Sequence, residues 1–229
     1  IIMRVSLGKS VLLGTMCLTV VACGGSTKEG DQATNPSDAS GATDTAAVGP
    51  EKRKEARKIA EAAYELRKVG KYAESLIEVD KAIALDKSDY YSHQLRADIN
   101  YGLNNVKEAI QDLKNSIALK PDEASLYYSK ALYEGSLKNY PDSLADAKEA
   151  VRLQPTNKDY LYLRSSNYSI AKDYKSAIAD ASAILKMDPK NENAYRMRAV
   201  CYYKLGDKKN SAADEKALHN LQRSNATVI

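Results

Sequence analysis

The 229-residue sequence contains no tryptophan, no phenylalanine, two histidines and three cysteines. Three scattered cysteines do not make a disulfide framework. His93 and His219 lie far apart and lack metal-ligand spacing. The chain also lacks a glycine-rich phosphate loop, an HExxH motif and a GxSxG motif. We therefore expect no catalytic residues, no metal site and no cofactor, and we expect that the protein is not an enzyme.

Charge excludes another class of protein. The chain has 34 Lys and Arg against 30 Asp and Glu, a net charge of +4. This mixed, mildly basic composition differs from the basic stripe that is typical of a nucleic-acid-binding protein. We expect no nucleic-acid partner.

The N-terminal sequence predicts a targeting segment. An apolar run from Val11 to Ala22 follows the basic residues Arg4 and Lys9. The run is too short to cross a hydrocarbon core as a helix, which takes about 20 residues, so residues 1–22 are interpreted as a signal peptide. The sequence VVAC ending at Cys23 resembles the lipobox of bacterial lipoproteins. The resemblance implies an acyl anchor on Cys23, with a chance cysteine after an ordinary signal peptide as the alternative.

Residues 23–50 form a linker in this interpretation. Gly, Ser, Thr, Ala, Asp and Asn dominate the segment, and it contains no aromatic residue. Such a composition buries too little apolar surface to offset the entropy of ordering, which predicts a disordered tether. The resemblance to lipoproteins, with Gly rather than Asp after Cys23, favours the outer membrane, with the body facing the periplasm. The basic run EKRKEARK at 51–58 is expected on the solvated face of a first helix, with anionic lipid head groups as a weaker alternative partner.

The remaining sequence repeats with a period of 34 residues. Pro121, Pro155 and Pro189 recur at this interval. Small residues do the same in two series, Ala63, Ala97, Ala131, Ser165 and Ala199, and Ser75, Ala109, Ser143, Ala177 and Ser211. Each unit contains two apolar stripes of helical period, and Gly70 and Gly206 stand in the break between stripes, where a left-handed C-cap is needed. Five units fit without insertion, at about 56–89, 90–123, 124–157, 158–191 and 192–225.

This pattern resembles the tetratricopeptide repeat (TPR). The resemblance implies an all-α fold over residues 51–229, a right-handed α-solenoid of five helix-turn-helix hairpins after the disordered tether. The first unit departs from the pattern at Lys87, where proline is usual, and the second at Asn100, where an aromatic residue is usual. Glu215 and His219 replace apolar residues in the fifth unit, which predicts a polar cap. Acidic and basic residues also recur at the period, which favours structural ion pairs between helices over catalytic carboxylates.

In the TPR family the first helix of each unit lines a concave groove. Carried onto this sequence, the resemblance gives a peptide-binding groove that consists of Arg57, Tyr64, Arg67, Tyr91, Gln94, Asp98, Tyr101, Tyr128, Leu132, Tyr162, Ser166, Asn193, Arg196, Val200 and Tyr203. Other tyrosines are assigned to the core because the chain has no other aromatic residue, namely Tyr72, Tyr127, Tyr140, Tyr168, Tyr174, Tyr195 and Tyr202. Cys201 is expected to be a buried, inert thiol.

The sequence thus predicts a lipoprotein scaffold or adaptor that binds a protein or peptide partner in the bacterial cell envelope. A glycan- or muropeptide-binding module is the alternative, because tyrosine rings in the groove could stack on sugars. The same tyrosines supply the rigid amphipathic area that protein interfaces favour. The choice between the two stays open in the sequence.

Overall fold

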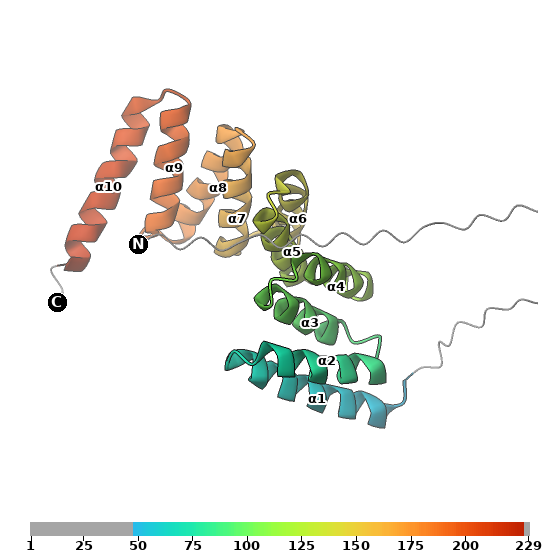
Figure 1. The fold of residues 1–229 in the computed structure, drawn as a ribbon. Helices are drawn as coiled ribbons and strands as arrows, with labels where there is room; N and C mark the ends of the chain where they lie inside the picture. Colours follow the sequence, from blue (N-terminus) through green and yellow to red (C-terminus); the bar gives the residue numbers. More distant parts are fainter. Residues whose placement is uncertain (1–47, 227–229) are drawn as a thin grey trace, which may run out of the picture. The chain divides into compact units, whose positions relative to one another are not determined.

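The computed structural model describes residues 48–226. The predicted signal peptide, Cys23 and nearly all of the predicted linker lie outside this range. Within it the chain forms ten α-helices and no strand (Figure 1). The helices are α1 (Pro50–Lys68), α2 (Tyr72–Leu85), α3 (Tyr90–Gly102), α4 (Val106–Leu119), α5 (Ala124–Ser136), α6 (Tyr140–Leu153), α7 (Lys158–Ile170), α8 (Tyr174–Met187), α9 (Glu192–Lys204) and α10 (Lys208–Ala226).

The helices pair in order as five hairpins, and each hairpin packs on the next. The predicted all-α solenoid of five hairpins is therefore confirmed. The first helices of neighbouring units also contact one another, α1 with α3, α5 with α7 and α7 with α9. Among the described helices, no two second helices pack as closely. The first helices therefore line the inner face of the stack, and this is the face that the predicted groove requires.

A left-handed residue ends the first helix of every hairpin. Gly70 and Gly206 have φ angles of 78° and 80°, as their places in the repeat predict. Asn104, Lys138 and Lys172 occupy the same place in the other three units, with φ angles of 65°, 62° and 62°. Side chains strain the backbone in this region, and asparagine tolerates it better than lysine. The hairpin therefore imposes a positive φ angle at this position, even where the residue type disfavours that angle.

Small residues allow the two helices of each hairpin to approach closely. Ala63, Ala97 and Ala131 are completely buried. The hydroxyl of Ser75 donates to the carbonyl of Ala63 at 2.6 Å, and that of Ser143 donates to Ala131 at 2.6 Å. A side chain larger than serine would have no room at such a contact. Both small-residue series therefore mark the contact within each hairpin.

Ion pairs join the two helices of four hairpins, as the recurring charges predict. In each pair a cation on the first helix donates to a buried or half-buried aspartate on the second. The pairs are Arg96–Asp112, Lys130–Asp146, Arg164–Asp180 and Arg198–Asp214. The first hairpin has Ala62 at the place of the cation, and Glu78 there pairs with Lys81 on its own helix. These carboxylates serve the fold.

The tyrosines divide differently from the prediction. The seven tyrosines assigned to the core are all half-buried, and among them Tyr72, Tyr127 and Tyr195 pack against core clusters. The tyrosines that are most buried are Tyr133 and Tyr160, at 7% and 8% exposed, and neither was predicted for the core. The assignment missed these two because each is buried against the first helix of the preceding unit: Tyr133 stacks on Tyr101 of α3, and Tyr160 packs against Tyr128 of α5. Cys201 is fully buried as expected, and burial raises the pKa of its thiol.

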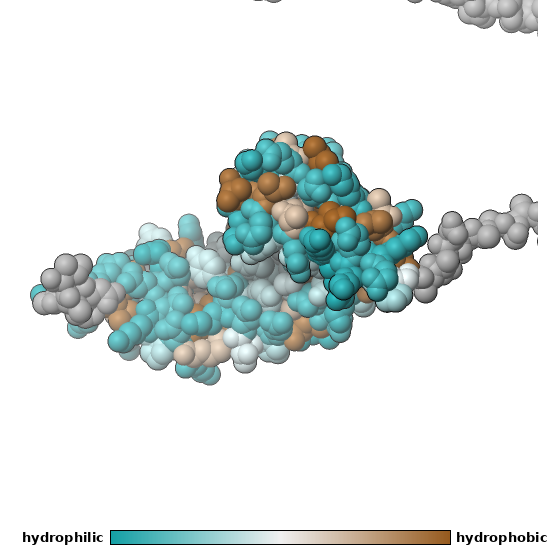
Figure 2. Space-filling model, turned by 90° about the horizontal axis from the view of Figure 1, so that it is seen from below, coloured by the Kyte–Doolittle hydropathy of each residue, from teal (hydrophilic) through white to brown (hydrophobic). Residues whose placement is uncertain are grey.

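Exposed apolar side chains are distributed in separate patches. Figure 2 views the helical body from below and shows apolar atoms in groups with hydrophilic atoms around them. Val69 on the turn after α1 and Tyr203 on α9 are the most exposed of the large apolar side chains, at 71% and 64%. No helix of the described part is long and apolar enough to cross a bilayer.

Candidate functional site

The inner face at α1, α3 and α5 carries a cluster of aromatic and charged side chains. Its members are Tyr64 and Arg67 of α1, Tyr91, Asp98 and Tyr101 of α3, and Tyr133 of α5. We call this set the Arg67–Asp98 cluster. Five of the six residues were predicted for the groove from the sequence, and Tyr133 was not.

Asp98 is the centre of the cluster. The hydroxyl of Tyr133 donates to Asp98 Oδ1 at 2.6 Å. Arg67 Nη1 lies 3.6 Å from Asp98 Oδ2 in an ion pair, so the carboxylate has one neutral hydrogen-bond donor and one neighbouring cation. Burial raises the pKa of Asp98, while the Tyr133 hydrogen bond and Arg67 oppose that rise. The result is a half-buried charge pair on the inner face.

The aromatic rings extend this polar centre. The Tyr101 ring stacks on the Tyr133 ring, with centroids 4.1 Å apart and planes inclined by 9°. The Arg67 guanidinium lies over the Tyr64 ring, 5.2 Å from its centroid. Tyr91 and Tyr101 are each 40% exposed. Rings that are fixed on one side and exposed on the other offer contact area that loses little side-chain entropy on binding.

One donor in the cluster has no acceptor. Arg67 Nε is buried, and it lacks a hydrogen-bond partner among the described residues. A buried donor left unpaired costs about 1–3 kcal/mol. A ligand oxygen that drew the guanidinium outward could satisfy this group, so Arg67 is suited to a carbonyl or carboxylate of a partner.

A small hollow adjoins the cluster at the start of the stack. It has a volume of about 270 Å³ and lies between α1 and α3. Arg57, Glu61, Asp89, Tyr90 and Tyr91 line it. Arg57, a predicted groove residue, is exposed there. Gln94, also predicted for the groove, is half-buried on α3.

The other predicted groove residues lie away from this cluster. Tyr128 on α5 is half-buried against Tyr160 of α7, with ring centroids 4.9 Å apart and planes inclined by 34°. It also packs against the core cluster of the later hairpins. Tyr162 on α7 is 39% exposed. Arg196 and Tyr203 belong to a groove between α9 and α10. The structure thus brings together the residues of α1 and α3 and separates them from those of α7 and α9.

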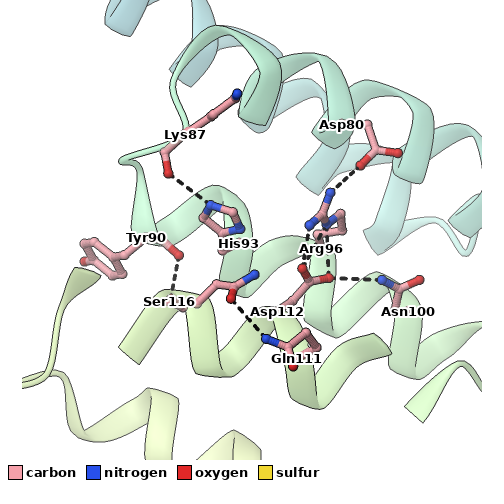
Figure 3. Close-up of polar contacts among 10 residues, drawn as sticks. Asp80, Lys87, Tyr90, His93, Arg96, Asn100, Gln111, Asp112 and Ser116 are labelled. Carbon is pink, nitrogen blue, oxygen red and sulfur yellow. Dashed lines mark hydrogen bonds and ion pairs between the residues drawn. The ribbon is translucent and has the colours of Figure 1, made fainter. Parts of the chain in front are cut away.

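A second polar group lies between α2, α3 and α4 and has a structural explanation. Figure 3 shows Arg96 between Asp112 and Asp80, and Asn100 beside Asp112. The adjoining hollow has a volume of about 380 Å³. Arg96 donates to Asp80 Oδ1 at 2.8 Å, so it joins the second hairpin to the first. These side chains form hydrogen bonds with one another. We therefore assign the group a structural role, which is to hold the stack together.

Residues 48–226 contain no group of three or more His, Cys, Asp or Glu side chains arranged to hold a metal ion. His93 is buried in α3, where its Nε2 lies 3.1 Å from the carbonyl oxygen of Lys87 (Figure 3). That contact ties α3 to the turn before it.

Solved structures with the same architecture include several solenoids. A crystal structure of MamA protein is 16% identical, with a TM-score of 0.70, covering 77% of this chain and 95% of that one. MamA 41-end from Desulfovibrio magneticus RS-1 is 19% identical, with a TM-score of 0.69 and coverages of 78% and 98%. YrrB, described as a TPR protein with an unusual peptide-binding site, is 17% identical, with a TM-score of 0.67 and coverages of 76% and 89%. These likenesses show the fold, a right-handed α-solenoid.

The comparison with sequence families gives the same result. No curated protein sequence matches the chain. The family model described as Tetratricopeptide repeat matches residues 95–158 and 161–222, which together make up more than half of the chain. The period of 34 residues, the five hairpins and the small-residue contacts all agree with this match. The chain therefore belongs to the tetratricopeptide repeat family.

Proposed function

We propose that this protein is a lipid-anchored TPR scaffold of the bacterial cell envelope, and that its Arg67–Asp98 cluster binds an extended segment of a protein partner. The TPR fold supports a role in protein–protein interaction. The lipobox-like sequence before Cys23 supports the anchor, and the composition of residues 24–50 supports a tether between anchor and body. In this proposal the body faces the periplasm from the outer membrane.

The observation that carries the binding site is the combination of paired charge, free donor and exposed rings in the Arg67–Asp98 cluster. A peptide backbone presents carbonyl oxygens and N–H groups at regular spacing. Arg67 can donate to a carbonyl, and Asp98 has lone pairs that can accept from an N–H. The rings of Tyr91 and Tyr101 can cover the side chains between them. Interfaces draw much of their binding energy from tyrosine and arginine in such settings.

Crosslinking in living cells tests this site. The full-length protein would carry a photo-crosslinking amino acid in place of Tyr91, which is exposed on the inner face. A matched control would carry it in place of Ile77, which is 58% exposed on α2, a second helix. We expect a discrete protein adduct from position 91 that is absent from position 77 and is lost when Arg67→Ala is added. The same adducts from both positions would contradict the proposal.

The exposed tyrosines also support the second candidate, a glycan- or muropeptide-binding module. Tyr91, Tyr101, Tyr162 and Tyr203 each expose about 40% or more of their surface, and an exposed ring can stack on a sugar. Sedimentation of the full-length protein with purified sacculi distinguishes the two candidates. Binding to sacculi that is lost in Tyr101→Ala, with no protein adduct from position 91, would favour the glycan module.

A further inference from the structure

The described stack ends in a surface that repeats an internal joint. At each internal joint, the second helix of one unit receives the first helix of the next. One position is buried in every second helix that another unit follows, and it is occupied by Val79, Leu113, Ala147 and Ala181. Val79 and Leu113 share core clusters with residues of the next first helix. The equivalent position of α10 is Glu215, which is exposed. Leu218 of α10 lies three residues after Glu215. The equivalent positions of the other second helices are buried, and they hold Ala82, Ser116, Ala150 and Ile184.

An open apolar groove lies on this surface. It has a volume of about 360 Å³ and is lined by Arg196, Ala199, Val200 and Tyr203 of α9 and by Glu215 and Leu218 of α10. Val200 and Tyr203 are 46% and 64% exposed. In α7 the positions equivalent to Val200 and Tyr203 hold Ser166 and Ser169. There the next first helix, α9, packs against α7. No other helix of residues 48–226 covers this groove, although the same kind of surface holds a first helix at every internal joint.

We propose that this groove binds an amphipathic α-helix of a partner protein, which stacks as the first helix of a sixth unit and places a basic residue opposite Glu215. The repeat specifies the shape of the occupant, because the groove continues the interface that α8 and α7 make with α9. A helix is the element that this interface accepts at every internal joint.

Glu215 specifies the charge of the occupant. Its carboxylate accepts a hydrogen bond from the hydroxyl of Ser211 at 3.2 Å. Among residues 48–226 no cation forms an ion pair with it. A carboxylate at the centre of a closing interface loses solvent, and a basic side chain on the incoming helix would compensate for that loss. An apolar helix without such a residue would bury Glu215 without a partner.

The charge of α1 argues against a second copy as the occupant. On α3, Leu95 and Ile99 belong to the same core cluster as Val79 of the preceding second helix. The equivalent residues of α1 are Glu61 and Glu65, both exposed. If α1 of another copy entered the groove, these two carboxylates would approach Glu215. Like charges at an interface oppose association, so head-to-tail stacking is disfavoured.

Two stapled helical peptides test the proposal on the full-length protein. Both have the α9 sequence, Glu192–Lys204, because that helix already fits an equivalent surface in this chain. One carries Cys201→Lys and the other Cys201→Glu, at the position equivalent to Ile99. We expect the lysine peptide to bind at least ~10-fold more tightly than the glutamate peptide. The lysine attracts the partly exposed carboxylate of Glu215, whereas the glutamate repels it. Methyl NMR shifts should be confined to Val200, Leu218 and their neighbours.

Variants of the protein make the test specific. Glu215→Lys should reverse the preference between the two peptides, and Leu218→Asp should abolish binding of both. Leu137→Asp, a change of the same kind at a residue that is 44% exposed after α5, is the control and should leave binding unchanged. Arg67→Ala should also leave it unchanged, so failure of this proposal is distinct from failure of the Arg67–Asp98 site.

Four results would overturn the proposal. The first is equal affinity for the two peptides, and the second is binding that survives Leu218→Asp. The third is concentration-dependent self-association of the full-length protein that Leu218→Asp removes, because a second copy would then be the occupant. Absence of binding by both peptides at millimolar concentration would equally reject the groove as a helix-binding surface.

Discussion

Replacing Tyr133 with phenylalanine tests whether the Arg67–Asp98 cluster depends on its buried hydroxyl. The change keeps the ring that stacks on Tyr101 and removes the donor that lies 2.6 Å from Asp98 Oδ1. A hydrogen bond to a charged group contributes about 1.5–3 kcal/mol. The side chain of Asp98 is 26% exposed, so water replaces part of the lost bond and we expect about 1.5 kcal/mol at neutral pH. In a body of this size that corresponds to a fall in Tm of roughly 3–6 °C.

The effect should depend on pH. Tyr133 favours the ionised form of Asp98, so removing the hydroxyl raises the pKa of Asp98 further above its usual range. Above both folded-state pKa values the wild type keeps its full advantage over Tyr133→Phe. As the pH falls through these pKa values, both proteins protonate Asp98 and the difference in stability shrinks. Thermal unfolding followed by circular dichroism at several pH values measures it.

A matched variant supplies the control. Tyr127 also donates its hydroxyl, to the carbonyl of Pro121 at 3.0 Å, but that bond is exposed. Tyr127→Phe should therefore change the free energy of unfolding by less than about 0.5 kcal/mol. If Tyr133→Phe unfolds at the same temperature as Tyr127→Phe at every pH, Asp98 does not depend on the buried hydroxyl and the description of the cluster is wrong.

Three further predictions concern the anchor, the helix contacts and the turns. Cys23→Ser should abolish incorporation of a fatty-acid analogue, and equal labelling of both proteins would reject the lipid anchor. Ala177→Leu should destabilise the body by roughly 1–3 kcal/mol in urea denaturation because this completely buried residue has no room for a larger side chain. Lys138→Gly should raise the free energy of unfolding by about 0.5–1 kcal/mol, because its φ of 62° suits glycine, and an unchanged urea midpoint would show that the turn is not strained.

The fold could be predicted from the sequence because every unit repeats the same local rules. The series that contains Ala97 and Ala131 identified the contact within each hairpin, and Gly70 and Gly206 identified the turns. The period also predicted which helix each groove residue would occupy. The period also places Asn104, Lys138 and Lys172 at the position of Gly70 and Gly206, but the two lysines are a residue type that does not by itself indicate positive φ.

The site was harder to predict because its contacts join different units. Tyr133 and Asp98 lie 35 residues apart, and their hydrogen bond depends on the angle between successive hairpins. A repeat period gives the position of a residue within its unit but not that angle. For the same reason, the period did not predict the contact of Tyr128 with Tyr160 or that of Arg96 with its second partner, Asp80. A search for polar and aromatic residues one position out of phase between neighbouring first helices could have found the pair of Asp98 and Tyr133.

The alanine at position 62 makes the first hairpin unlike the other four. Those four each hold their two helices with an ion pair, whereas α1 and α2 have none at that place. In a repeat protein, each unit contributes its own stability and that of its joints to neighbours, so units can open separately. The amide protons of α1 and α2 would then exchange through local opening at a lower free energy than those of the inner hairpins. This hairpin also carries Arg67 and Tyr64, so the partner site would be built on a part of the stack that opens more easily than the inner hairpins, and a bound partner would slow that exchange.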